Sequence, residues 1–384
     1  MYFQLSHKKN STITTQVMCA IVFCLFSFIW LYWTQVDVLT VAQHAFSNGQ
    51  THYDRTVGAI LITLVLQLMQ KVVFRFAKLD KHAHALTYVP SMLMLALICK
   101  YTPEMSVSYP WISTLLLVVI VLLIWSASLW MAHQMLPFVS EKGNTGVFSR
   151  RNWVNMLTMA GMMLMVAGVS NTNAVFQFRS HAELAIGQGD YKEALRTGSR
   201  SNETDVSLTM LRAYALSKEN LLGEKLFEYP IEGRGQDLLP LPGSKSRLLI
   251  LPKDSLYFHL GARPIGIHSM KRYLDLLEKD SLATHAVADY RLCALLIDKK
   301  ISAFVHYLPQ YYDLNEYLPK VYREALTLYV HSTQHPVIEF SHEVMNEDWK
   351  NFQALVKAVQ SKKEKDARLY ELYASSYWYY YFYK

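Results

Sequence analysis

Long apolar stretches follow one another through the first 174 residues, and none of comparable length occurs afterwards. A helix of about 20 apolar residues is long enough to cross the hydrocarbon core of a bilayer. The stretch at 84–99 is shorter and contains Pro90. We predict a membrane domain of residues 17–175, after a cytoplasmic N-terminus of residues 1–16. Its five transmembrane helices are expected at about 17–34, 56–74, 84–99, 111–137 and 152–174.

Positive charge in the first half gathers on one side of these predicted spans. Residues 1–174 carry 11 Lys and Arg against 5 Asp and Glu, whereas residues 175–384 carry 27 against 26. Nine of the eleven basic residues lie in the terminus and loops of one side, and only Arg55 and Lys100 lie on the other. Because basic residues are retained in the cytoplasm, we predict a cytoplasmic N-terminus and a C-terminal half on the opposite side. The balanced charge of that half gives no indication of a nucleic-acid partner.

The second half, residues 176–384, has the spacing of a helical-repeat domain. A Gly-Asp-Tyr-x-x-Ala-Leu sequence joins amphipathic stretches, and weaker copies follow at 284–308 and 319–332. Gly187 and Gly189 are expected to permit a close approach of helices. Tyr191 would fill the space between them, and Ala215 would let the second helix lie close. The predicted fold is all-α, a polytopic membrane bundle followed by a tetratricopeptide-like domain of residues 176–384 with an irregular insert at 230–268.

The last predicted span carries small residues in pairs. Ala160 with Gly161 and Ala167 with Gly168 recur at a spacing of seven, which places them on one face of the helix, two turns apart. Small residues let two membrane helices approach closely. We expect this face to pack within the protein's own bundle, and a homodimer is the alternative.

Few residues form a pattern typical of catalysis or of a metal site. His331 and His335 are four apart, but Pro336 ends any helix that could place both on one face. The four cysteines, of which only Cys293 lies in the second half, form no metal-binding pattern. We therefore predict no metal and no cofactor.

The first predicted outer loop, residues 37–54, is the most polar part of the membrane half. It carries Asp37, His44 and Asp54. Glycosyltransferases that use lipid-linked sugars place a catalytic acidic residue in their first outer loop, and this chain is similar to them in layout only. We expect an ordinary solvated loop, and these three residues are the candidates if the protein is an enzyme.

The sequence YASSYWYYYFYK contains more aromatic residues than one helix face can hold. They could close the end of the repeat domain, lie at the lipid headgroups, or bind a partner, for which Tyr and Trp are frequent anchors. The candidate partner-binding residues are Tyr377, Trp378, Tyr380, Tyr381 and Phe382.

Several stretches together resemble an uncharacterised family of polytopic membrane proteins of Bacteroidota. They include QVDVLTVAQHAFSNGQTHYDRTVGAILIT, HALTYVPS, LPKDSLYFHLGARPIG, DSLATHAVADYRLCALLIDK, LPKVYREALTLY, EVMNEDW and YWYYY. The resemblance implies a bacterial inner membrane, a periplasmic C-terminal domain and a tetratricopeptide-like fold for that domain. It implies no activity and no functional residues.

Two functions are consistent with this sequence. The favoured one is a scaffold in the lipid bilayer whose periplasmic repeats bind another envelope protein, since solenoids present extended binding surfaces. The alternative is a membrane enzyme or carrier for a lipid-linked substrate of the glycolipid type. A transporter is less favoured, because no span carries a pair of ionisable residues in its middle.

Overall fold

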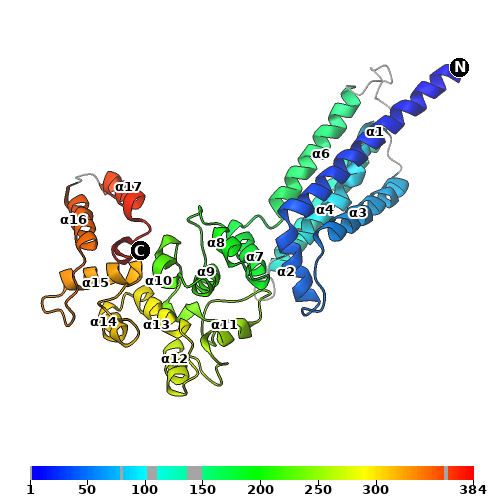
Figure 1. The fold of residues 1–384 in the computed structure, drawn as a ribbon. Coiled ribbons are helices and arrows are strands. Elements are labelled where there is room, and N and C mark those ends of the chain that lie inside the picture. The colour runs from blue at the N-terminus through cyan, green and yellow to red at the C-terminus, as the bar shows by residue number, and fades with distance from the viewer. Residues whose placement is uncertain (1, 78–80, 102–109, 136–148, 359–361) are drawn as a thin grey trace. The chain divides into compact units, whose positions relative to one another are not determined.

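The computed structural model describes residues 2–77, 81–101, 110–135, 149–358 and 362–384, and helices are the only regular secondary structure in them (Figure 1). The predicted all-α class is confirmed. Contacts divide the chain into two compact units, Met1–Asn173 and Ala174–Lys384. We refer to them as the N-terminal unit and the C-terminal unit. The observed division lies two residues before the predicted boundary.

The N-terminal unit is a bundle of apolar helices. Four helical segments are long and apolar enough to cross a membrane: Ile13–Thr34, Arg55–Ala77, Ile112–Gln134 and Arg150–Val169. The unit consists of α1 (Tyr2–Ile29), the π-helical η1 (Trp30–Thr34), α2 (Val36–Phe46), α3 (Arg55–Ala77), the 3₁₀-helical η2 (Lys81–Tyr88), α4 (Val89–Ile98), α5 (Pro110–Met135) and α6 (Arg150–Val169).

The third predicted span is shorter than the other four. It consists of the 3₁₀ turns of η2 followed by the ten-residue α4, and Pro90 lies in the first turn of α4. A proline is tolerated there because the first N–H groups of a helix have no partner within it. The last predicted span also ends early, since α6 stops at Val169 and a new helix starts at Ala174. Residues 136 and 137 of the fourth predicted span lie outside the described residues.

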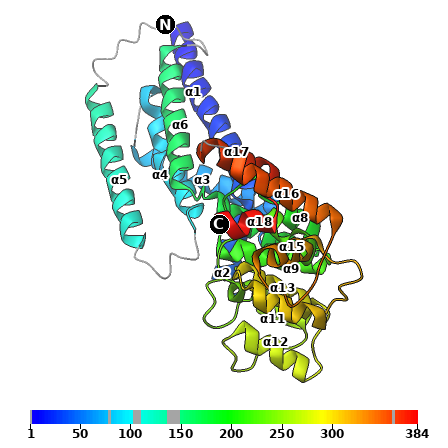
Figure 2. The same ribbon diagram turned by 90° about the vertical axis from the view of Figure 1, so that its left-hand side faces the viewer.

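Helix α5 lies at the edge of this bundle (Figure 2). No residue of its apolar segment Ile112–Gln134 is buried. Its polar links to the neighbouring elements include the Trp125 indole N–H, which donates to the Leu86 carbonyl at 2.9 Å, and Thr114, which accepts from Lys100 at 2.9 Å. A helix that is apolar on every side suits an environment of hydrocarbon.

The C-terminal unit contains only short helices, most of them below 15 residues. They are α7 (Ala174–Gly187), α8 (Tyr191–Arg196), α9 (Val206–Lys218), α10 (Leu222–Lys225), η5 (Leu226–Glu228), η6 (Gly235–Leu238), α11 (Lys253–Leu260), α12 (Met270–Lys279), α13 (Ala286–Ile297), α14 (Ile301–Tyr307), η7 (Leu308–Gln310), α15 (Lys320–Ser332), α16 (Glu343–Ala358), α17 (Lys362–Tyr373) and α18 (Tyr377–Tyr383).

One turn geometry recurs in this unit. Two residues after the ends of α7, α9 and α13 lies a residue with positive φ: Gly189 (79°), Asn220 (57°) and Lys299 (57°). In each case the following N–H bonds a carbonyl five residues earlier, at 2.8 to 2.9 Å. This is the hydrogen bond of the Schellman motif, which closes a helix C-terminus. The next helix starts at once, so α7–α8, α9–α10 and α13–α14 are helical hairpins.

The predicted irregular insert at 230–268 is held against the helices by a buried carboxylate. One oxygen of Glu183, on α7, accepts hydrogen bonds from the N–H groups of Leu249, Ile250 and Leu251 at 2.6 to 2.7 Å. Asp237 in turn accepts from Arg234, Ser244 and Lys245. The insert therefore packs as part of the C-terminal unit although it has little regular structure.

Candidate functional site

Helix α18 docks onto the C-terminal unit through the buried Glu324 of α15. The Glu324 carboxylate accepts a hydrogen bond from the Tyr377 N–H at 2.7 Å, and the Glu324 carbonyl accepts one from the Trp378 indole at 2.7 Å. Ser376 caps the helix, because its hydroxyl accepts from the Tyr379 N–H. A carboxylate at this position also complements the positive end of the helix dipole. We call this arrangement the α18 junction.

The Glu324 side chain is only 3% exposed. Burial raises the pKa of its carboxyl to about 7, against the opposing effects of Lys320, of the Tyr377 N–H and of Arg323. The Lys320 ammonium lies 3.9 Å from the carboxylate. Because the pKa is close to neutral pH, the charge at the junction changes in the physiological range.

Two of the candidate partner-binding residues belong to the core instead. Tyr377 is 0% and Trp378 2% exposed. The Tyr377 ring packs on Phe227 at 5.0 Å between centroids, and Trp378 packs on Trp349 at 5.2 Å. These two residues belong to the core of the C-terminal unit. The prediction that they bind a partner is therefore wrong, because a partner cannot reach them in this structure.

The remaining aromatic residues of α18 are partly open to solvent. Tyr380 is half-buried and donates its hydroxyl to the Ile297 carbonyl at 2.9 Å. Tyr381 is half-buried, and Phe382 is 52% exposed. On another side of the helix Tyr379 stacks on Tyr383 at 5.3 Å. We call Tyr379, Tyr381, Phe382 and Tyr383 the terminal aromatic surface.

The predicted outer loop at 37–54 is partly helical. Residues Val36–Phe46 form α2, which buries Val38, Leu39, Val41 and Ala42. The expectation of an ordinary solvated loop is therefore wrong for residues 37–46, because apolar residues at helical spacing stand within this polar stretch.

The three enzyme candidates of this loop have separate surroundings. Asp37 lies half-buried in the first turn of α2. The His44 ring lies over Gly49. Asp54 is exposed and caps α3, because its carboxylate accepts from the N–H groups of Thr56 and Val57 at 2.9 and 2.7 Å. The position of Asp54 is thus explained by helix capping, and Asp37 is the more informative candidate.

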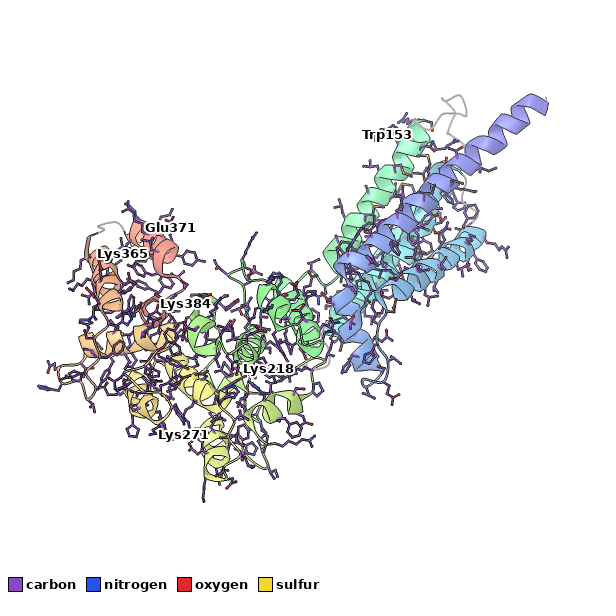
Figure 3. All side chains as sticks on the ribbon, viewed as in Figure 1. Trp153, Lys218, Lys271, Lys365, Glu371 and Lys384 are labelled. Carbon is purple, nitrogen blue, oxygen red and sulfur yellow. The ribbon has the colours of Figure 1, made fainter. Side chains whose placement is uncertain are left out.

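The small residues of α6 do not pack as expected. The buried face of α6 consists of Asn152, Asn155, Met159, Met162 and Val166. Gly161 and Gly168 lie on the opposite face, where an added Cβ would meet no atom within 4 Å, and Ala160 is exposed beside them. Ala167 is half-buried. Close packing inside the bundle is therefore wrong for Gly161 and Gly168. Trp153 is exposed at the start of the same helix (Figure 3).

The repeat-turn residues divide into two groups. Ala215 is fully buried in α9, and the half-buried Tyr191 ring lies edge-on to Tyr214 at 6.3 Å. Gly189 provides the positive φ that the turn requires. Gly187 makes no close contact, since an added Cβ would meet nothing within 4 Å. An added Cβ at Gly189 would also meet nothing within 4 Å, so the expected close approach of helices is wrong at both glycines.

A serine–histidine pair was not singled out from the sequence. Ser217 on α9 and the His259 Nε2 of α11 are 2.8 Å apart. Burial, together with smaller effects of Lys218 and His285, lowers the pKa of His259 to about 4. In a Ser-His-Asp triad an acidic group orients the imidazole, whereas the charged neighbours that act on His259 are Lys218 and His285. The pair is 42 residues apart in sequence, so no local spacing could reveal it.

The described part of the chain contains no candidate metal site. No cluster of three or more His, Cys, Asp or Glu side chains there has the arrangement that could hold an ion. The histidines 331 and 342 lie beside Asn346 and Arg323 respectively.

Residues 266–384 match a family of unknown function, DUF6057. The matched region begins just before α12 and includes the α18 junction and the terminal aromatic surface. No curated protein and no solved structure matches the chain.

Proposed function

We propose that the protein is a scaffold of the bacterial inner membrane whose C-terminal unit binds another envelope protein. The observation that carries this proposal is the terminal aromatic surface. Tyr377 and Trp378 anchor α18 in the core, and Phe382 is left largely exposed on the same short helix. Exposed aromatic side chains on a rigid support are typical anchors of protein interfaces.

The proposed topology has five spans, with η2 and α4 forming the third. Four segments meet the length of a span, and the shorter Ala83–Ile98 is apolar enough to accompany them. An odd number of spans and the charge asymmetry of the loops together favour a periplasmic C-terminal unit. Lys78 and Lys142, which contribute to this asymmetry, lie outside the described residues. The helical hairpins of the C-terminal unit support a tetratricopeptide-like assignment.

Site-directed photo-crosslinking in intact cells tests the scaffold function. A photoreactive amino acid at Phe382 is expected to capture one defined second protein. The control position is Val337, which is 87% exposed but lies outside the terminal aromatic surface. Phe382→Ala combined with a crosslinker at Tyr381 should then reduce the yield. No product at position 382, or the same products at 337 and 382, contradicts the proposal. Deleting 377–383 is a poor test, because it removes core residues.

An enzyme or carrier for a lipid-linked substrate is the second proposal, and the surroundings of Asp37 favour it. The π-helical η1 connects the first long helix directly to α2, and π-helical turns are frequent at functional sites. Asp37→Asn is expected to abolish activity in a growth or envelope-integrity assay while leaving the amount of protein unchanged. A silent Asp37→Asn contradicts this proposal. Asp54→Asn is less decisive, because it also weakens the cap of α3.

A further inference from the structure

The core of the N-terminal unit contains a row of neutral polar side chains. The row begins where α1, α6 and η2 meet. Thr15 donates to Asn152 at 2.6 Å, and Asn155 accepts from the Ala85 N–H at 2.8 Å. Beside them Gln70 of α3 donates to Thr87 of η2 at 2.8 Å. These buried groups connect four elements at one end of the bundle.

The row continues along α1 and the antiparallel α3. The Cys24 thiol lies 3.8 Å from the Gln67 amide oxygen, and the Tyr88 hydroxyl is within hydrogen-bonding reach of Gln67. One turn further along, Ser91 of α4 donates to the Leu66 carbonyl at 2.8 Å. Ser27 is three residues after Cys24, and Thr63 is four residues before Gln67, so both lie in the next level of the row.

The row ends around Cys99. The Trp30 indole and the Ser170 hydroxyl face the Cys99 sulfur, which is a weak acceptor. Gln35 donates to the Asn171 carbonyl at 3.3 Å, at the C-terminal ends of η1 and α6. From Thr15 to Gln35 the helix advances by about 30 Å at 1.5 Å per residue. That length equals the thickness of the hydrocarbon core of a bilayer.

Many of these groups lack a protein partner. Four buried polar atoms of the row make no hydrogen bond to any described residue: Ser27 Oγ, Gln35 Oε1, Thr63 Oγ1 and His84 Nδ1. The Trp30 indole and the Ser170 hydroxyl have only the Cys99 sulfur as a weak acceptor. Within a membrane neither lipid tails nor bulk solvent can bond them, so each is costly unless a small polar molecule is bound. Bound water forms such bonds at buried polar groups in proteins.

We propose that the N-terminal unit holds a file of water molecules along this row and conducts protons across the membrane. Water both donates and accepts, which suits a row that mixes hydroxyl, amide and indole groups. His84, 4% exposed and on η2, contributes an imidazole to the row. Its ring lies edge-on to Phe74 at 5.0 Å and to Tyr88 at 5.8 Å between centroids.

Proton transfer along the file leaves the protein in the same protonation state at the end as at the start. A proton binds to the water or imidazole at one end, each member of the file passes a proton to the next, and one proton leaves at the other end. An imidazole can accept a proton on one nitrogen and release one from the other. The net charge moved is one unit, which a potassium current in the opposite direction compensates in the test below. This activity is independent of the scaffold function.

Reconstitution of the full-length protein tests proton conduction. Vesicles of phosphatidylcholine and phosphatidylglycerol contain a fluorescent pH indicator and a high potassium concentration. Valinomycin then creates a negative internal potential that draws protons inward. Vesicles with the protein are expected to acidify faster than protein-free vesicles. Equal rates overturn the proposal.

Two variants and a matched control locate the path. Thr63→Val removes a hydroxyl of the row at nearly constant volume and is expected to slow acidification about fivefold, the effect of losing one hydrogen bond. His84→Asn replaces the imidazole by an amide, which cannot accept a proton on one nitrogen and release one from the other, and it is also expected to slow acidification. Thr158→Val is the control and should conduct like the wild type, because Thr158 lies outside the row, and its hydroxyl bonds the Val154 carbonyl of its own helix. If Thr63→Val and His84→Asn both conduct like the wild type, the proposed path is wrong.

A second measurement applies if the variants fail to fold. Radiolytic labelling with hydroxyl radicals modifies buried side chains only where water lies beside them. In the wild-type protein Tyr88 is expected to be labelled although it is 1% exposed. Absence of label on Tyr88 contradicts a water file.

Discussion

In the C-terminal unit, buried carboxylates hold irregular backbone against helices, whereas the buried polar groups of the N-terminal row are neutral and several lack a protein partner. Glu183 binds three N–H groups of the insert, and Glu324 binds the start of α18. The row from Thr15 to Gln35 includes no carboxylate. A soluble core can contain a charge if hydrogen bonds compensate its desolvation, but within a lipid environment a charged group is far more costly. Buried polar groups therefore stabilise the fold of the C-terminal unit, whereas those of the row are the groups to which we assign the proposed water file.

Among these predictions, the largest change in stability is expected for a substitution of Glu183. Glu183→Ala removes the acceptor of three N–H groups, and we expect a loss of about 3–5 kcal/mol of stability, as for a buried polar group that loses its partner. Thermal unfolding of the detergent-solubilised protein measures it. Hydrogen exchange should increase first at residues 249–251. Glu371→Gln on the exposed face of α17 is the control, and equal losses in both variants contradict the comparison.

The free energy of unfolding should also depend on pH through Glu324, with an effect nearly as large as that of Glu183→Ala. The folded-state pKa of Glu324 is about 7 against an ordinary value of 4.5. Between these values the folded protein binds more protons than the unfolded one, so stability falls as pH rises. Since one pKa unit corresponds to about 1.4 kcal/mol, the loss can reach about 3 kcal/mol.

Chemical unfolding between pH 5 and pH 8, followed through tryptophan fluorescence, to which the buried Trp349 and Trp378 contribute, measures this loss. Burial also raises the pKa of Glu183, so the wild-type slope contains both groups. Glu324→Gln should retain only the remaining slope. An identical slope in the variant would show that Glu324 does not titrate in this range.

For Thr63→Val we expect a small change in stability, in the direction opposite to that of Glu183→Ala. Thr63→Val removes a buried hydroxyl without a described partner, and replacing such a group by a methyl is neutral or stabilising by up to about 1 kcal/mol. Thermal unfolding in detergent measures it. A destabilisation like that of Glu183→Ala would contradict the difference between the two units.

The smallest effect concerns Gly187. Gly187→Ala places a methyl group in open space at the end of α7, where φ is not positive. We expect a stabilisation of about 0.5 kcal/mol from the lower entropy of the unfolded chain. The same substitution at Gly261 should be strongly destabilising, because an added Cβ would lie 2.1 Å from the Leu282 carbonyl oxygen and φ is 142°. Similar melting temperatures of the two variants would contradict this account.

Features that depend only on residues close together in the chain can be predicted from the sequence. An apolar stretch such as that of α3 is visible because hydropathy is a local property. The turn at Gly189 is visible because glycine favours a positive φ. The helix α2 was missed because its apolar residues stand among histidine, glutamine and aspartate, which are typical of loops.

Long-range partners could not be predicted from the sequence. Glu183 binds residues 66 to 68 positions away, and Glu324 binds Tyr377, 53 positions away. Nothing in the residues around a glutamate shows that it will be buried at such a contact. The same holds for the aromatic sequence YWYYY, in which only the packing on Phe227 and Trp349 separates core residues from surface residues.

The α18 junction has a consequence for the order in which the chain is made. Glu324, Phe227 and Trp349 leave the ribosome before the two residues that cover them, Tyr377 and Trp378. Until those residues arrive, the nascent C-terminal unit exposes an aromatic face and an unbonded carboxylate. Chaperones and proteases recognise exposed apolar surface. A ribosome stalled shortly before Tyr377 should therefore yield a chain that is removed rapidly, although α18 is the only one of the described helices that has not been translated.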